Sequence, residues 1–135
     1  MQQWLVILIG AAIQMVLGAF WYSPIGFGKI WMKGMGYTDK DMEKSKNRGM
    51  AKLYIAAFIG SILTSFVLAR VVLLINARSV GSGAATALLL WLGFAVPLLL
   101  SSVLWEQKPL KIYFINIAYQ LVSMVVMGSV IGFLI

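Results

Sequence analysis

Four uninterrupted apolar runs constrain this chain more than any other feature. They cover residues 3–22, 53–75, 84–105 and 110–135, and a helix needs about 20 apolar residues to cross the roughly 30 Å hydrocarbon core of a bilayer. Only 11% of the 135 residues are charged, whereas soluble domains carry about 25%. The sequence lacks the short alternating strands of a membrane barrel. It therefore predicts an all-α fold, a four-helix transmembrane bundle that forms one integral-membrane domain over residues 1–135.

Basic residues are distributed unevenly between the segments that join these runs. Segment 24–52 and the turn after the third run hold nine of them: Lys29, Lys33, Lys40, Lys44, Lys46, Arg48, Lys52, Lys108 and Lys111. The opposite side holds two, Arg70 and Arg78. Because cytoplasmic loops carry an excess of Lys and Arg, we expect 24–52 to be a cytoplasmic loop and both termini to lie on the outer side. We therefore interpret the net charge of +7 as orientation in a cell membrane, with a bacterial inner membrane as the expected location, and expect no nucleic-acid partner.

The chain is poorly supplied with groups for chemistry. It has no Cys and no His, so it lacks a thiol nucleophile, a thiolate ligand and the commonest general base. Three of its four acids, Asp39, Asp41 and Glu43, lie in the loop, which leaves Glu106 as the one acid near a predicted helix. We expect a protein that is not an enzyme and that holds no metal and no cofactor.

The stretch 18–36 marks where the first helix leaves the bilayer. Two aromatic residues stand where a headgroup belt is expected, and a proline then ends the helix and restricts the residue before it. The residues that follow mix apolar side chains with lysine, as in a segment that lies on the membrane surface. We predict an interaction surface made of Trp21, Tyr22, Ser23, Pro24, Phe27, Gly28, Lys29 and Trp31. Thr38 and Asp41 further on have the spacing of a capping box and predict a short helix through Lys46.

Each predicted helix has one face of small or polar residues at about 100° per residue. The faces are Gln3, Gly10, Gln14, Gly18 and Trp21; Tyr54, Ala57, Ser61 and Thr64; Gly83, Thr86, Gly93, Pro97 and Ser101; and Tyr113, Asn116, Gln120, Ser123 and Met127. The first interpretation is packing, since small residues let helices approach and amides bond across them. The second is a polar path through the bundle, lined by Gln14, Pro97, Tyr113, Asn116, Gln120 and Ser123. Pro97 would add a free acceptor, the Gly93 carbonyl.

Four charged residues are expected at the membrane interfaces. Arg70 extends to the headgroups or pairs with the C-terminal carboxylate of Ile135. Glu106 forms an interfacial ion pair near Lys108 and Lys111, with a proton- or cation-coupling carboxylate as the alternative.

Taken together, these residues resemble a small membrane family that is catalogued as domain of unknown function 1761. The resemblance rests on GAFWYSP at 18–24, FGK at 27–29, Trp31 and MG at 35–36; on WLGF at 91–94 with Pro97; and on WE at 105–106, KPLK at 108–111, IN at 115–116 and Tyr119. It covers essentially the whole chain and implies the same architecture without an activity. The family pattern has a histidine where this chain has Arg70, which argues against a proton relay there.

Two classes of function remain. A structural or accessory membrane subunit would dock a membrane-protein partner or lipid headgroups through the segment 21–33, and this is the class that we prefer at this point. A homo-oligomeric transporter or channel for a small solute or ion is the alternative, restricted to uncharged solutes or a passive pore because no ionisable residue lies at mid-membrane. Gly128 and Gly132 have the spacing of a close helix contact and predict a homo-oligomer, most simply a dimer.

Overall fold

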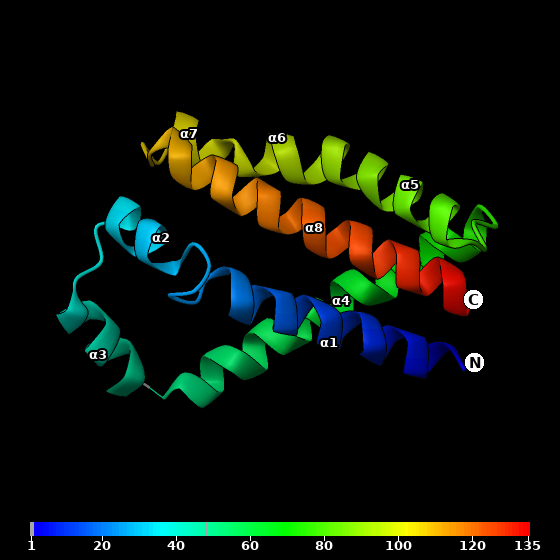
Figure 1. Ribbon diagram of the computed structural model, residues 1–135, viewed down its shortest axis with the longest axis horizontal. Coiled ribbons are helices and arrows are strands. Elements are labelled where there is room, and N and C mark those ends of the chain that lie inside the picture. The colour runs from blue at the N-terminus through cyan, green and yellow to red at the C-terminus, as the bar shows by residue number, and fades with distance from the viewer. Residues whose placement is uncertain (1, 48) are drawn as a thin grey trace.

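The structure, a computed structural model, describes residues 2–47 and 49–135 and confirms the four-helix prediction. Within this described part, four helices are long and apolar enough to cross a membrane: Gln3–Trp21 (α1), Met50–Leu74 (α4), Val80–Leu104 and Leu110–Leu134 (α8). Both termini lie at one end of the bundle, and the loop between α1 and α4 lies at the other (Figure 1). This arrangement agrees with an even number of crossings, and the outer location of both termini stays a prediction.

Two helices begin earlier than the apolar runs do. α4 begins at Met50, directly after Gly49, whose φ of 94° is left-handed, and the third crossing begins at Val80. There the Ser79 hydroxyl accepts a hydrogen bond from the Ser82 amide at 3.1 Å, which is the usual role of serine at a helix N-cap. A left-handed glycine precedes the first of these starts and a capping serine precedes the second.

The loop contains two short helices, Gly28–Met35 (α2) and Asp39–Asn47 (α3). The capping box before α3 is confirmed, because the Thr38 amide donates to Asp41 Oδ2 at 2.9 Å and the Asp41 amide donates to Thr38 Oγ1 at 3.3 Å. α2 lies against the loop end of α8, where a Cβ on Gly34 would come within 2.3 Å of Ile112. Arg48 and the side chain of Lys46, both used in the orientation prediction, lie outside the described residues.

The third crossing is interrupted at its centre. It consists of Val80–Leu90 (α5), the π-helical turn Trp91–Ala95 (η1), Val96–Leu99 (α6) and Ser101–Leu104 (α7). A π turn inserts an extra residue into the helix, so everything after it is rotated relative to a regular α-helix. Gly83 and Thr86 before the turn are buried, whereas Pro97 and Ser101 after it are exposed. The predicted single face of this helix is therefore wrong beyond the turn.

α5 and α8 pack so closely that their backbones nearly touch. A Cβ on Gly83 would lie 2.1 Å from the Gly128 carbonyl oxygen, and one on Gly132 would lie 2.2 Å from the Ser79 carbonyl oxygen. The two glycines with close-approach spacing are thus used inside the chain, and the surface that we predicted for a dimer is wrong. The homo-oligomer itself stays a prediction, and it needs another surface.

The core lies at the end of the bundle that carries the termini. Val6 of α1, Leu68 and Val72 of α4, and Met127 and Ile131 of α8 are buried there. α4 crosses α1 and then diverges from the other helices toward the loop (Figure 1), so every residue from 51 to 60 is exposed. The bundle is consequently closed at the terminal end and open at the loop end.

Candidate functional site

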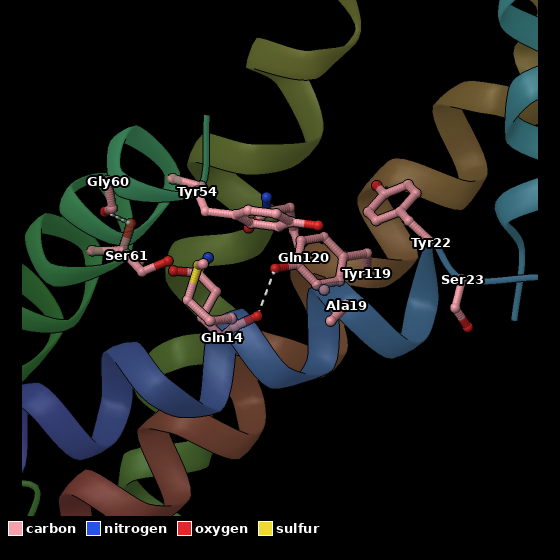
Figure 2. Close-up of a pocket in the computed structure, with 13 residues that line it drawn as sticks. Gln14, Ala19, Tyr22, Ser23, Tyr54, Gly60, Ser61, Tyr119 and Gln120 are labelled. Carbon is pink, nitrogen blue, oxygen red and sulfur yellow. Dashed lines mark hydrogen bonds between the residues drawn. The ribbon is translucent and has the colours of Figure 1, made fainter. Parts of the chain in front are cut away.

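A cleft of about 690 Å³ lies where α4 diverges from α1 and α8 (Figure 2). Its small lining residues, such as Gly18 and Ala19 on α1 and Ala57 and Gly60 on α4, leave this space open between the helices. Its polar lining consists of Gln14, Tyr22, Ser23, Tyr54, Ser61, Thr64, Tyr119 and Gln120. The volume lies within the range of about 300–1,000 Å³ that is usual for small-molecule sites. We call this space the central cleft.

Gln14 is the most unusual residue of the central cleft. Its side chain is only 8% exposed, and its Oε1 is buried with no hydrogen-bond partner among the described residues. A buried acceptor without a donor costs about 1–3 kcal/mol, so such groups are normally paired. A residue with an unpaired buried acceptor therefore lines the cleft.

The crossing of α1 and α4 forms the floor of the cleft. Gly10 lies directly against Ser65, since a Cβ on Gly10 would fall 2.1 Å from Ser65 Oγ. Gln14 and Ser61 lie one helical turn from this contact on their respective helices, on the loop side, and both line the cleft. Below the contact the core is filled by apolar side chains, including Val6 and Leu68. The cleft is thus blind at the terminal end.

Tyr119 closes part of the cleft from the side of α8. Its hydroxyl donates to the Gln14 carbonyl oxygen at 3.0 Å (Figure 2). Gly18 permits this approach, because a Cβ there would lie only 2.8 Å from the Tyr119 hydroxyl. In the sequence, Tyr119 stands out only as part of the family resemblance. Tyr119 lies about one turn after Asn116, which belongs to the predicted polar path. This spacing indicates that the Tyr119 hydroxyl lies on the same face of the helix as Asn116.

Two residues of the predicted interaction surface, Trp21 and Tyr22, bond to α8. Trp21 Nε1 donates to the Ile115 carbonyl oxygen at 3.2 Å, and the Tyr22 hydroxyl donates to Asn116 Oδ1 at 2.6 Å. Tyr22 also makes edge contacts with the rings of Trp31 and Tyr119, at centroid distances of 5.6 and 5.3 Å. The structure therefore joins the first and last parts of the resemblance, through residue pairs that are 94 positions apart in the chain, and Tyr22, Trp31 and Tyr119 form one aromatic cluster.

Backbone contacts fix the turn that carries this aromatic cluster. The Phe27 amide donates to the Trp21 carbonyl oxygen at 2.7 Å, and the Gly28 amide donates to the Ser23 carbonyl oxygen at 3.0 Å. A Cβ on Gly28 would lie 2.3 Å from the Tyr22 carbonyl oxygen, so this turn requires glycine. Pro24 and Lys29 are exposed on its outer side.

The residues of the predicted polar path are distributed over several environments. Gln14 and Gln120 line the central cleft together. Asn116 is engaged by Tyr22, and the Tyr113 hydroxyl donates to the Val96 carbonyl oxygen at 2.8 Å. Ser123 is fully buried and bonds within its own helix to the Gln120 carbonyl oxygen, at 3.3 Å. Pro97 is exposed on the outside of the bundle, because the π turn rotates it away.

The predicted interfacial charges lie outside the central cleft. Arg70 is exposed near the terminal end of α4, and Glu106 and Lys111 are exposed around the turn that precedes α8. Lys108 is half-buried, and its amide donates to the Ser102 carbonyl oxygen at 2.9 Å. These positions agree with side chains that extend into the headgroup region.

A family described as "Protein of unknown function (DUF1761)" has a model that matches residues 5–132. No curated protein matches this chain, and no solved structure matches it.

Proposed function

The chain belongs to the DUF1761 family of unknown function, and from the geometry of its central cleft we propose that it is a membrane carrier for a small uncharged solute, without enzymatic activity. The observation that carries the proposal is the buried and unpartnered Oε1 of Gln14, a residue that lines a space large enough for a ligand. A solute with a hydroxyl or amide N–H would give this oxygen its missing donor.

The chemistry of the lining supports an uncharged ligand. Apart from tyrosine hydroxyls, the lining residues include no acidic or basic side chain. A charged solute at this depth would lose its hydration without an opposite charge to compensate it, and that loss is very costly. Glu106 and Lys29 are exposed outside the cleft, so we assign them no contact with the solute.

The shape of the bundle supports a carrier in preference to a pore. The apolar core around Val6, Leu68 and Met127 closes the path at the terminal end, and the cleft opens only where α4 diverges. Transport then requires a second arrangement in which the loop end closes and the core opens. We assign this movement to α4, because all of its residues 51–60 are exposed.

The accessory-subunit class receives less support than it did from the sequence. Trp21 and Tyr22 are engaged by α8 within the same chain, so they are not free to dock a partner. A docking surface would have to use the outer side of the turn, where Ile25 is 84% exposed.

Glycerol flux into proteoliposomes tests the proposal, because glycerol is small, uncharged and rich in donors. Wild-type protein should raise the flux above that of protein-free vesicles, and Gln14→Leu should lower the increase about tenfold through loss of one hydrogen bond. Gln3→Leu is the matched control, since Gln3 lies exposed on the same helix. A wild-type flux equal to that of empty vesicles, together with a co-purifying partner that is lost on Ile25→Asp, would favour the accessory class instead.

A further inference from the structure

An apolar groove of about 470 Å³ runs along the outside of α1 and α4, next to the central cleft. Its lining includes Met15 and Val16 on α1, and Ile55 and Phe58 on α4. The tyrosine at position 54 contributes the only hydrogen-bonding side chain of the groove lining. Val16 and Ile55 are 68% and 61% exposed, so in a membrane this groove opens sideways into the hydrocarbon region.

The groove and the central cleft adjoin each other. Met15 and Tyr54 line both of them, so the apolar space and the polar one share two lining side chains. Together the two spaces offer an apolar arm that faces lipid and a polar end that Gln14 lines.

The central cleft and the apolar groove are suited to bind different parts of one ligand. Gln14 Oε1 lacks a donor among the described residues, and a hydroxyl group supplies one. An ammonium group would also donate, but the lining offers no carboxylate to balance its charge, and an unbalanced charge at this depth is far more costly. The apolar arm fits an aliphatic chain, and its volume lies within the range of a site for one drug-sized molecule.

We propose that the ligand is an uncharged single-chain amphiphile with a hydroxyl head group, which enters from the bilayer with its chain in the groove and its head in the central cleft. This inference rests on the proposed carrier function and names the class of its substrate. The aliphatic chain of the ligand exchanges contacts with lipid for contacts with the groove, so its transfer gains little from the hydrophobic effect. This aliphatic chain mainly concentrates the ligand at the depth of the cleft. The hydroxyl group of the ligand provides the selectivity.

Competition between two lipids that differ in their donors tests this directly. The purified full-length protein is incubated with equal amounts of monoolein, which has hydroxyl groups, and methyl oleate, which has none, and the retained lipid is measured by native mass spectrometry. Wild-type protein should retain monoolein about tenfold over methyl oleate, as one satisfied buried acceptor implies. Gln14→Leu should reduce this preference to about one, and Gln3→Leu should keep it. Equal retention of both lipids by the wild type overturns the inference.

A second variant tests the groove. Ala12 lines the groove and is exposed, so Ala12→Phe should fill the space without disturbing the core and should lower retention of both lipids. Ala56→Phe introduces the same side chain at an exposed position of α4 outside the groove lining and should leave retention unchanged. Equal effects of the two substitutions overturn the assignment of the groove. A glycerol flux that depends on Gln14, without any preference for monoolein, overturns this inference alone. If the wild type shows neither the glycerol flux nor the preference for monoolein, the carrier function is overturned as well.

Discussion

The hydrogen bond between Tyr22 and Asn116 offers a quantitative test of how the two halves of the chain are joined. It links the end of α1 to α8 at 2.6 Å, between two half-buried side chains. Interhelical hydrogen bonds in membranes contribute about 0.6–2 kcal/mol, and the short distance and partial burial place this one near 1 kcal/mol. We predict that Tyr22→Phe and Asn116→Leu each lower the free energy of unfolding by about 1–2 kcal/mol, because each leaves the other partner unpaired.

The double variant separates the energy of the hydrogen bond from the cost of leaving one partner unpaired. Its loss of stability should be smaller than the sum of the two single losses by about 1 kcal/mol. The assay is reversible unfolding in mixed micelles with increasing dodecyl sulfate, followed by circular dichroism. Tyr37→Phe, at an exposed tyrosine, is the control and should change stability by less than about 0.5 kcal/mol. Strictly additive losses would refute the claim that these two residues hold the loop end together.

Two further predictions concern the α5–α8 contact and the loop. Gly132→Leu should prevent normal packing of the monomer, because a Cβ already falls 2.2 Å from the Ser79 carbonyl oxygen; an unfolding curve that matches the wild type, with a change only in oligomeric state, would contradict this. In the loop, hydrogen bonds from the Thr38 amide and hydroxyl hold the pKa of the Asp41 carboxyl below its usual range. The contribution of this capping box is therefore present above the usual carboxyl pKa of about 4 and is lost as the pH falls through the lower folded value. Hydrogen exchange at the Thr38 amide should accelerate relative to neighbouring amides in that range, and Asp41→Asn, which removes the titrating carboxyl, should abolish the difference.

The crossings were predictable from the sequence because bilayer thickness leaves few alternatives. An apolar run of about 20 residues has to satisfy all its backbone groups within itself, and a helix does this. The capping box at Thr38 was equally predictable, since it depends on two side chains that are close in the chain. These features are local, and local spacing is what a single sequence displays.

Features that depend on the partner helix were not predictable in the same way. The spacing of Gly128 and Gly132 indicates a close approach, but it does not say whether the approaching helix belongs to the same chain, and here it contains Gly83. The π turn at 91–95 changes which residues face inward, and a regular 100° period cannot anticipate it. The shared location of Gln14 and Gln120 in one cleft followed from their polar character, whereas the contribution of Tyr119 depends on the absence of a side chain at Gly18.

The central claim is that the space between α1, α4 and α8 is a solvated binding cleft, and the reactivity of a single thiol tests it most directly. The chain contains no cysteine, so one introduced residue reports on one position. Ala57 lines the cleft, whereas its exposed neighbour Ala56 does not. A thiol reacts as the thiolate, which apolar surroundings suppress.

In proteoliposomes, Ala57→Cys should therefore react with methyl methanethiosulfonate at least about tenfold faster than Ala56→Cys, and monoolein should slow the reaction at Ala57→Cys alone. Equal rates at the two positions, unchanged by monoolein, would contradict the binding cleft and leave these polar faces with a packing role only.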